Sequence, residues 1–409
     1  VHVVFNLAWR DPVIRENDGF LKGLAEKGRG FTEEEKGILA AKQKDIIKQI
    51  LPKYREMEEK EIIEVTTSPY YHPILPLLCD SYSAKVAMPG IELPQKRFVC
   101  AEDAEYQVKS GIKLHEKTFG RKPKGMWPSE GSVSEAIIPI IANEGINWIA
   151  TDEEILANSL KTAIRRDSKG HCLDPEILYK PYLATAGGKG LSIIFRDHIL
   201  SDLIGFVYTT WNAEKAADDF IDRLLKIRSS LKDTDGCLVS IILDGENAWE
   251  YYKKDGADFL TALYERLSGN PLLRLVTVSE HLNEHPHREE LPMLYSGSWI
   301  NHNFKIWIGH SEDNTAWDYL QDARDALVEY TDTLKRSGEL NDHNDKILLA
   351  WKEIYAAEGS DWFWWYGDEH TSMSDKEFDE LFRRHVKKVY SLIGKEPPLY
   401  LDVPIMLEE

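Results

Sequence analysis

A chain of 409 residues is long enough for a large buried core, and its formal net charge of -19 argues against binding to nucleic acid or to anionic membranes. The four cysteines show no CxxC spacing, which argues against a disulfide framework or a zinc knot. No stretch reaches the ~18 apolar residues of a membrane span and no signal-peptide pattern opens the chain, so we expect a soluble, cytoplasmic protein.

The first 310 residues alternate short apolar runs with helix-sized segments. In chain order the runs are "VHVVFNLAW", "IIEVTT", "GMWP", "INWIATD", "LSIIFRD", "CLVSIILDG" and "LRLVTVSEHL". This order predicts repeated β/α units around a parallel sheet or barrel over residues 1–310. Between the first two runs, Thr32 and the three glutamates after it predict a capped helix that reaches about Lys60 and is interrupted at Pro52.

The pattern of the sequence changes after about residue 310. Three amphipathic segments follow, each with Ser, Asp or Asn at its start and Gly near its end. We expect them to form a helical bundle over residues 311–395. The last stretch, residues 396–409, is rich in proline and predicts an extended tail.

Two acidic residues stand where apolar runs end. Glu130 closes "GMWPSE", and Asp244 follows the apolar part of "SIILDGENAWEYY". Reactive groups in parallel α/β barrels lie at the carboxyl ends of strands. Two carboxylates placed there suit a glycosidase, in which one attacks the anomeric carbon and the other protonates the leaving oxygen. A first-turn glutamate and an Asp-Gly turn or helix cap remain the structural alternatives.

Further polar and aromatic residues gather at other predicted strand ends and in one late segment. Hydrogen-bonding groups beside aromatic faces suit neutral sugars. Glu64, Tyr70, Tyr71 and His72 lie in "IIEVTTSPYYHP", Arg196, Asp197 and His198 end "SIIFRDH", and Asp361 and Trp362 belong to "SDWFWWYGDEH". Their structural alternatives are a satisfied histidine, a charge pair within a loop and a domain interface.

Five stretches in this order resemble family 57 of the glycoside hydrolases, and most of all its amylopullulanase and α-amylase branch: "EIIEVTTSPYYHPILPLL", "GMWPSEGSVS", "IILDGENAWEYY", "SGSWI" and "DWFWWYGDEH". The resemblance covers nearly the whole chain. It implies an incomplete seven-stranded (β/α) barrel followed by a helical bundle that completes the active-site cleft. It also implies retaining hydrolysis or transfer at α-1,4 or α-1,6 glucosidic bonds of an α-glucan or maltooligosaccharide, with neither a metal nor another cofactor.

The same resemblance implies roles for individual residues. Glu130 matches the family's nucleophile and Asp244 its general acid/base. Such a mechanism requires an ionised Glu130 and a protonated Asp244 at working pH, a difference that neighbouring groups and burial must create. The residues that would support the site or contact the substrate are Glu64, His72, Trp127, Arg196, Asp197, His198, Trp299, Asp361 and Trp362, with Trp299 and Trp362 as sugar platforms.

One feature of the family is missing from the sequence. Members begin with a strand that carries a His-Gln-Pro motif, whereas "VHVVFNLAW" resembles the family's second strand. We expect the first strand to lie upstream of Val1, and a degenerate relative is the alternative. A barrel without that strand would have an open edge.

Three other functions stay open. Transfer to a sugar hydroxyl, as in a 4-α-glucanotransferase or branching enzyme, differs from hydrolysis only in the attacking group. A metal-dependent deacetylase or α-mannosidase needs converging ligands, and Asp197, His198 and Asp202 lack a paired spacing such as HxxxH. A catalytically impaired glucan-binding relative is the third, although the presence of both Glu130 and Asp244 argues against it.

Overall fold

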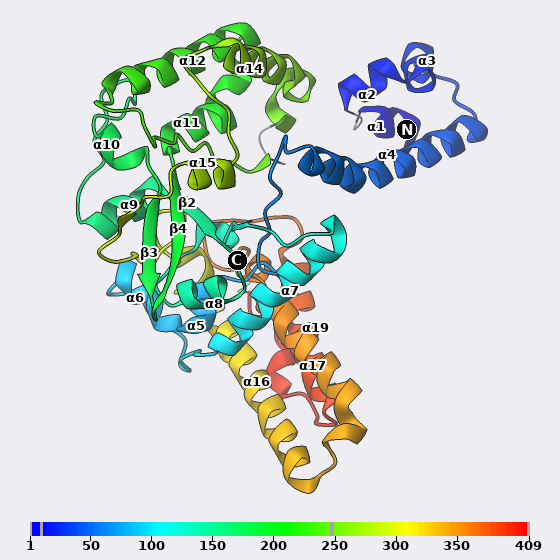
Figure 1. Ribbon diagram of the computed structural model, residues 1–409. Coiled ribbons are helices and arrows are strands. Elements are labelled where there is room, and N and C mark those ends of the chain that lie inside the picture. Colours follow the sequence, from blue (N-terminus) through cyan, green and yellow to red (C-terminus); the bar gives the residue numbers. More distant parts are fainter. Residues whose placement is uncertain (1, 9–10, 246–248, 407–409) are drawn as a thin grey trace. The chain divides into compact units, whose positions relative to one another are not determined.

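The sheet that carries several of these strand ends is built from short strands. In the computed structural model, which describes residues 2–8, 11–245 and 249–406, five strands pair in the order β1-β2-β4-β3-β5. Figure 1 labels the three longer strands, β2, β3 and β4. They are β1 (Gly125–Met126), β2 (Trp148–Asp152), β3 (Tyr182–Ala186), β4 (Lys189–Arg196) and β5 (Glu289–Glu290). Strands β1 and β2 run parallel, whereas β3 and β4 form an antiparallel hairpin.

Glycines at two places set the geometry of this sheet. A Cβ at Gly125 would lie 2.1 Å from the indole ring of Trp148, so only glycine lets β1 and β2 approach. The hairpin turns at Gly187 and Gly188, whose φ angles of 56° and 72° match the left-handed positions of a two-residue hairpin turn. The predicted runs "GMWP", "INWIATD" and "LSIIFRD" thus contribute β1, β2 and β4.

The described residues group into two units, and each unit is discontinuous in sequence. The first unit comprises Val1–Val65, Ile164–Lys180 and Arg196–His287, and the second comprises Thr66–Ala163, Pro181–Phe195 and Arg288–Glu409. The α-helices of the first unit are α1 (His2–Ala8), α2 (Pro12–Asn17), α3 (Gly19–Lys27), α4 (Glu33–Glu59), α10 (Pro175–Leu178), α11 (His198–Asp202), α12 (Ala213–Ser230), α14 (Ala257–Gly269) and α15 (Val278–Glu284). Those of the second are α5 (Leu75–Cys79), α6 (Ala84–Ala87), α7 (Ala101–Phe119), α8 (Ile137–Asn143), α9 (Glu153–Leu160), α16 (Ser311–Ser337), α17 (Asn344–Ala357), α18 (Ser360–Phe363) and α19 (Asp375–Leu392). The domain boundary at residue 310 stays a prediction.

The N-terminal run "VHVVFNLAW" folds as helix α1, so the prediction of a strand is wrong for its described part. Val3 and Leu7 are four residues apart, which places both on one side of a helix. They pack into a small core with Leu21, Leu24 and Leu39 of helices α3 and α4. A strand would also need a paired neighbour for its backbone groups, whereas a helix satisfies most of them internally.

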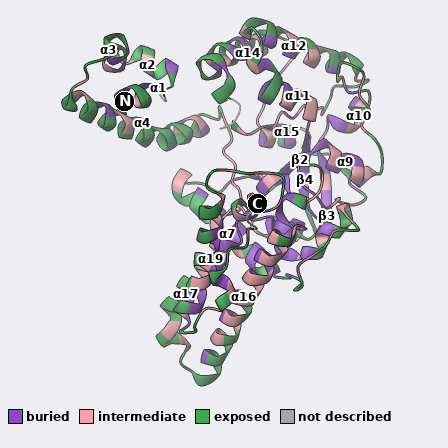
Figure 2. Cartoon of the chain, turned by 180° about the vertical axis from the view of Figure 1, so that it is seen from behind, coloured by how far each residue is buried: buried purple, intermediate pink, exposed green. Residues whose placement is uncertain are grey.

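Helix α4 begins as predicted but does not break where predicted. The Thr32 hydroxyl accepts from the Glu35 N–H and the Glu35 carboxylate accepts from the Thr32 N–H, which forms a capping box. The helix continues through Pro52 to Glu59, so the predicted interruption is wrong. Figure 2 shows how little of α4 is buried, and we attribute the tolerance of this proline to the solvent around it, which can hydrate the carbonyl that loses its partner.

Three other predicted strands are absent as regular strands. In "IIEVTT" Thr67 forms a single parallel bridge with Met126, and in "CLVSIILDG" Ser240 forms one with Arg196. In "LRLVTVSEHL" the chain enters helix α15 at Val278. The parallel direction of both bridges agrees with the predicted β/α order, but an apolar run indicates burial and does not guarantee a continuous ladder.

The three amphipathic segments after residue 310 are helices, as predicted. Helices α16, α17 and α19 pack against one another in the second unit (Figure 1). Their contact faces carry buried apolar side chains at helical spacing, such as Leu320, Ala323 and Leu327 on α16 and Phe382 and Val386 on α19. Within the described part of the chain, no helix is both long and apolar enough to cross a membrane.

Candidate active site

Glu130 lies in a tight turn directly after strand β1. Trp127 donates its backbone N–H to Thr67 O at 2.9 Å, and Ser129–Gly131 then form a single 3-10 turn. Glu130 has a φ of 56°, a left-handed conformation that costs a residue with a side chain of order 1–3 kcal/mol. Such strain persists only where surrounding contacts hold the backbone, and it is frequent at functional sites.

Trp299 holds this turn from a second segment. Its backbone N–H donates to Glu130 O at 3.1 Å, and its indole Nε1–H donates to Glu130 Oε2 at 2.9 Å. Two backbone hydrogen bonds of 2.8 and 3.1 Å between Val133 and Gly297 anchor that segment. The rings of Trp127 and Trp299 meet edge to face, with centroids 5.0 Å apart. The half-buried Glu130 carboxyl therefore lies beside an aromatic pair.

The neighbouring parallel strand ends in a carboxylate that is not among the predicted site residues. Asp152 is the last residue of β2, is fully buried and accepts from the Glu154 N–H at 3.0 Å as the N-cap of α9. His302 Nδ1 lies 4.0 Å from Asp152 Oδ1. The run "INWIATD" ends in this aspartate, so the strand-end rule that selected Glu130 and Asp244 would also have selected Asp152.

A second set of predicted residues lines a pocket in the same unit. The His72 ring Nδ1 bonds to Ser360 Oγ at 2.9 Å, and the Ser360 N–H donates to His72 O at 3.1 Å, which ties the loop around His72 to helix α18. Beside this junction lies a pocket of about 410 Å³, a size within the roughly 300–1,000 Å³ of small-molecule sites. Its lining comprises Tyr71, Leu349, Lys352, Glu353, Ala356, Gly359, Asp361, Trp362 and His385.

This pocket combines an aromatic ring with polar and charged groups. The Trp362 indole N–H donates to Ala356 O at 2.7 Å, which fixes the orientation of the ring. Glu353 Oε2 lies 2.6 Å from His385 Nδ1. Burial raises the pKa of the Tyr71 hydroxyl, so this group remains a neutral hydrogen-bond donor. An apolar face beside carboxylates and a hydroxyl can bind a neutral sugar.

In the first unit, Asp244 comes after a segment that contacts both the backbone and the side chain of Arg196. Arg196 pairs in parallel with Ser240, and its Nη1 donates to Ile242 O at 3.4 Å. Asp244, two residues further along, is half-buried. Residues 246–248 of the same motif lie outside the described residues. The segment before Asp244 is also held by the Ile242 N–H, which donates to Ser201 Oγ at 3.1 Å.

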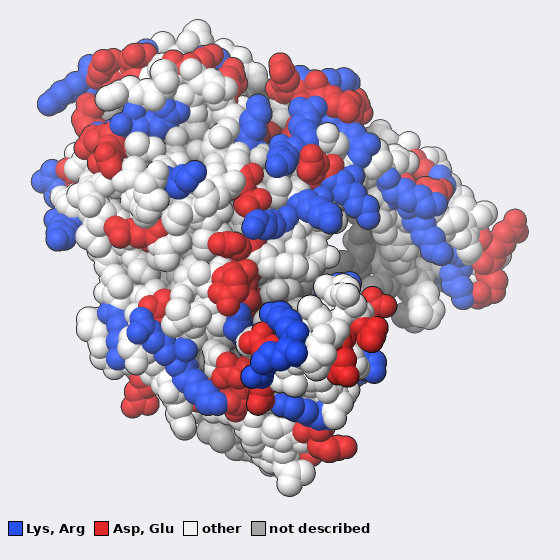
Figure 3. Space-filling model, turned by 60° about the horizontal axis from the view of Figure 1, so that its bottom comes forward, with Lys and Arg blue, Asp and Glu red and all other residues white. Residues whose placement is uncertain are grey.

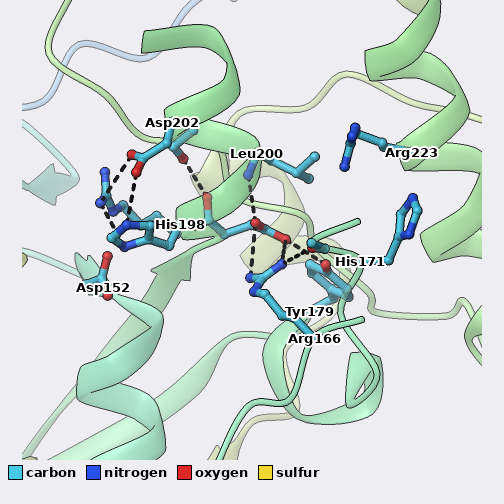
Figure 4. A network of polar contacts seen from close by, with 12 residues as sticks. Asp152, Arg166, His171, Tyr179, His198, Leu200, Asp202 and Arg223 are labelled. Atoms are coloured by element: carbon cyan, nitrogen blue, oxygen red, sulfur yellow. Dashed lines mark hydrogen bonds and ion pairs between the residues drawn. The ribbon is translucent and has the colours of Figure 1, made fainter. Parts of the chain in front are cut away.

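Arg196, His198 and Asp202 interact with one another after strand β4 (Figure 4). Arg196 Nη2 lies 3.2 Å from His198 Nδ1 and 3.7 Å from Asp202 Oδ1, and His198 Nε2 lies 2.9 Å from Asp202 Oδ2. A guanidinium can only donate, so His198 Nδ1 accepts and the imidazole carries its proton on Nε2, where Asp202 accepts it. Each of the three groups therefore already has a partner in the fold.

Asp197 is buried and lies among several hydrogen-bonding and charged partners, of which Figure 4 labels Arg166, Tyr179 and Leu200. Its carboxylate accepts from the Leu200 N–H at 2.8 Å and the Tyr179 hydroxyl at 2.6 Å, and it pairs with Arg166 at 3.1 Å. Its backbone N–H donates to Ser240 O at 2.9 Å. Burial raises the pKa of Tyr179, which keeps that hydroxyl a donor. Asp197 is therefore both the N-cap of α11 and the acidic partner of Arg166 in an ion pair.

Glu64 is engaged with the start of helix α15. One carboxylate oxygen accepts from the Ser279 N–H at 2.9 Å and the other accepts from Ser279 Oγ at 2.5 Å. A carboxylate at the N-terminus of a helix satisfies backbone N–H groups that have no partner within the helix. The structure thus places Glu64 in a helix-capping contact, and its contact with substrate stays a prediction.

The three residues considered as metal ligands, Asp197, His198 and Asp202, have the partners described above, and two histidines of another segment also lie close together. His281 Nε2 lies 3.2 Å from Gly236 O, and its ring lies 4.8 Å from that of His285. Throughout residues 2–8, 11–245 and 249–406, no group of three or more His, Cys, Asp or Glu side chains is placed to hold a metal ion.

The predicted site residues divide between the two units. The second unit contains His72, Trp127, Glu130, Trp299, Asp361 and Trp362, and the first contains Glu64, Arg196, Asp197, His198 and Asp244. In the second unit, direct contacts join Trp127, Glu130 and Trp299. In the first, Arg196 contacts His198, whereas Glu64 bonds to Ser279.

Known proteins resemble the chain in sequence and in fold. The model of glycosyl hydrolase family 57 matches residues 2–294. A family 57 branching enzyme from Thermococcus kodakaraensis is 16% identical with a TM-score of 0.67, over 96% of this chain and 76% of that chain. An α-amylase from Thermotoga maritima is 15% identical with a TM-score of 0.63, over 96% of this chain and 79% of that chain. A 4-α-glucanotransferase from Thermococcus litoralis is 16% identical with a TM-score of 0.53, over 87% of this chain and 52% of that chain.

No curated protein sequence matches the chain. At these low identities the solved structures show the fold alone, and that fold confirms the predicted class, an incomplete (β/α) barrel followed by a helical bundle. The family match extends over more than half of the chain and includes both Glu130 and Asp244. The chain therefore belongs to glycosyl hydrolase family 57.

Proposed function

We propose that this protein is a retaining enzyme of α-glucans, similar to the α-amylases and amylopullulanases, that cleaves α-1,4 or α-1,6 glucosidic bonds. The observation that supports the proposal is the Glu130 turn, in which a glutamate after a parallel strand is held in a strained conformation beside two indole rings. An aromatic wall next to a carboxylate suits the apolar face and the reacting carbon of a sugar.

In the proposed reaction, Glu130 attacks the anomeric carbon while Asp244 gives its proton to the leaving glucosidic oxygen. A covalent glycosyl-Glu130 ester forms and the shortened glucan leaves. Asp244, now ionised, removes a proton from water, the resulting hydroxide attacks the anomeric carbon, and the Glu130 carboxylate is released. Two inversions at one carbon retain its configuration.

The charge of the chain agrees with a neutral partner. The formal net charge is -19, and the face drawn in Figure 3 carries acidic and basic side chains interspersed with one another. Binding to a neutral polysaccharide requires hydrogen-bonding groups and apolar faces, which the pocket around Trp362 offers.

A second candidate is glucan transfer, in which a sugar hydroxyl replaces water in the second step. It is favoured by the likeness of the chain to solved structures described as branching enzymes and as a 4-α-glucanotransferase. Products from soluble starch separate the two reactions. Hydrolysis raises the number of reducing ends, whereas transfer redistributes chain lengths or adds branches with little new reducing sugar.

The assignment of roles is tested with Glu130→Ala and Asp244→Asn on a 4-nitrophenyl α-maltooligoside, with and without azide. If Glu130 is the nucleophile, azide should restore turnover of Glu130→Ala and give the β-glycosyl azide, because only one inversion occurs. If Asp244 is the acid/base, azide should attack the glycosyl-enzyme of Asp244→Asn and give the α-glycosyl azide. Full activity of Glu130→Ala without azide would contradict the proposal.

A further inference from the structure

The contact between Trp299 and Glu130 differs from what a sugar platform requires. A platform presents the face of its ring to the sugar and needs no contact from the ring nitrogen. Here the Trp299 indole N–H is directed at Glu130 Oε2 at 2.9 Å, and the backbone N–H of the same residue donates to Glu130 O at 3.1 Å. One residue thus binds both the main chain and the carboxylate of the proposed nucleophile.

Short hydrogen bonds and a close backbone approach stabilise the segment around Trp299. Ser298 is fully buried, and its hydroxyl lies 3.1 Å from the Ile300 N–H and 2.7 Å from Asn303 O. A Cβ at Gly297 would lie 2.3 Å from His302 O, so the backbone segments on the two sides of this turn are in close contact. Because the turn closes on itself, Trp299 has little freedom to follow Glu130 if the carboxyl moves.

The conformation of Glu130 makes such support necessary. Its left-handed backbone is strained, and a glutamate with three side-chain torsions would lose orientation without a fixed partner. A hydrogen bond to the ionised form of a carboxyl also favours that form over the protonated one. A nucleophile needs both properties, since attack requires an ionised oxygen aimed at the anomeric carbon.

We propose that Trp299 is a positioning residue that acts through its indole N–H on Glu130. This inference rests on the proposed function, because it assumes that Glu130 is the nucleophile. Loss of the N–H should lower kcat roughly 10- to 100-fold with little change in KM. It should also move the acidic limb of the kcat/KM profile to higher pH, because the ionised carboxyl loses a hydrogen-bond donor.

The sharpest test replaces Trp299 by 3-benzothienylalanine, which keeps the bicyclic ring and has sulfur in place of the N–H. Trp299→Phe serves as the genetically encoded companion. Turnover of a 4-nitrophenyl α-maltooligoside is measured over a range of pH, together with the melting temperature. Trp351→Phe in helix α17 is the matched control, because it makes the same change outside the Glu130 turn and should leave both limbs of the profile unchanged.

The outcomes separate this inference from the assignment of Glu130. If the benzothienyl variant keeps the wild-type kcat and pH profile while Glu130→Gln is inactive, the positioning role is wrong and the nucleophile stands. If KM rises while kcat and the acidic limb stay, Trp299 is a sugar platform only. If Glu130→Gln itself keeps full activity, the proposed function fails first.

Discussion

The Glu130 turn and the Asp197 network both follow strands of one sheet, yet the fold uses their carboxylates differently. Asp197 is 1% exposed, and it accepts from a backbone N–H and a tyrosine and pairs with an arginine. Glu130 is half-buried, in a strained turn, with an indole N–H on one oxygen. A strand end therefore marks acids in different surroundings: Asp197 is fully buried in an ion pair, whereas Glu130, the proposed nucleophile, is half-buried on a strained backbone.

The largest expected effect concerns Glu130. Glu130→Gln should lower kcat by about 10³-fold or more, because the amide is a far poorer nucleophile, while the melting temperature stays near that of the wild type. Turnover of soluble starch and differential scanning calorimetry measure the two quantities. Glu144→Gln, in a partly exposed pair with Lys109, is the control and should be fully active. Equal activity of both variants would show that Glu130 has only a structural role in the turn.

Asp197→Asn should lower the stability of the fold more than its activity, which is the reverse of the result expected for Glu130→Gln. Arg166 would lose its buried carboxylate partner, and removal of one member of such a pair costs about 3–5 kcal/mol of unfolding free energy. Denaturant unfolding gives this value, and activity is compared per folded molecule. Asp174→Asn, which breaks the more exposed pair with Arg165, should cost at most about 1 kcal/mol. Wild-type stability with lost activity would instead place Asp197 among the substrate contacts.

A third kind of acid sharpens the comparison, because the buried Glu358 has a neutral amide as a hydrogen-bond partner. It accepts from Gln107 Nε2 at 2.8 Å, and burial, followed by the nearby Asp103, raises its pKa well above the ordinary range. Arg324, which pairs with Asp103, acts on it more weakly in the opposite direction.

The sign of the pH effect follows from proton binding. Above the ordinary glutamate pKa the unfolded chain has released the proton that folded Glu358 keeps, so this group destabilises the fold as pH rises, by up to about 1.4 kcal/mol per pH unit until the folded pKa is reached. Glu358→Gln should remove that slope. The unfolding free energy of the variant relative to wild type should increase between pH 5 and pH 8, whereas the exposed Glu380→Gln should show no trend. A parallel pH dependence of Glu358→Gln and wild type would mean that Glu358 is ionised in the fold.

The smallest effect is expected at Glu64, a predicted substrate contact that the structure places at the start of α15. Glu64→Gln should cost about 1 kcal/mol of unfolding free energy, since the amide keeps one acceptor and loses the charge at the helix N-terminus. The value of KM should not change. Ser279→Ala is the matched control, because it removes the hydroxyl donor to Glu64 and keeps the backbone N–H donor. A raised KM with unchanged stability would instead indicate that Glu64 contacts the substrate.

Local patterns in the sequence were sufficient for much of the fold. The capping box at Thr32 and the amphipathic bundle helices were predicted because a helix is specified by contacts between residues three or four apart. The runs that became β1, β2 and β4 combined apolar character with turn signals at their ends. Strand-end acids, among them Glu130 and Asp244, were also predicted, although whether they act stays open to experiment.

The rest depended on contacts between residues distant in the sequence. Residues 2–8 became a helix because Val3 and Leu7 had a core to enter on α3 and α4. Asp197 became structural because Arg166 and Tyr179 reach it. Trp299 bonds to a residue 169 positions earlier, and no local pattern encodes that pairing. The sequence alone determined where acids, rings and the bundle helices occur, whereas the tertiary structure decided which partners each acid has, because hydrogen-bond partners are supplied by packing.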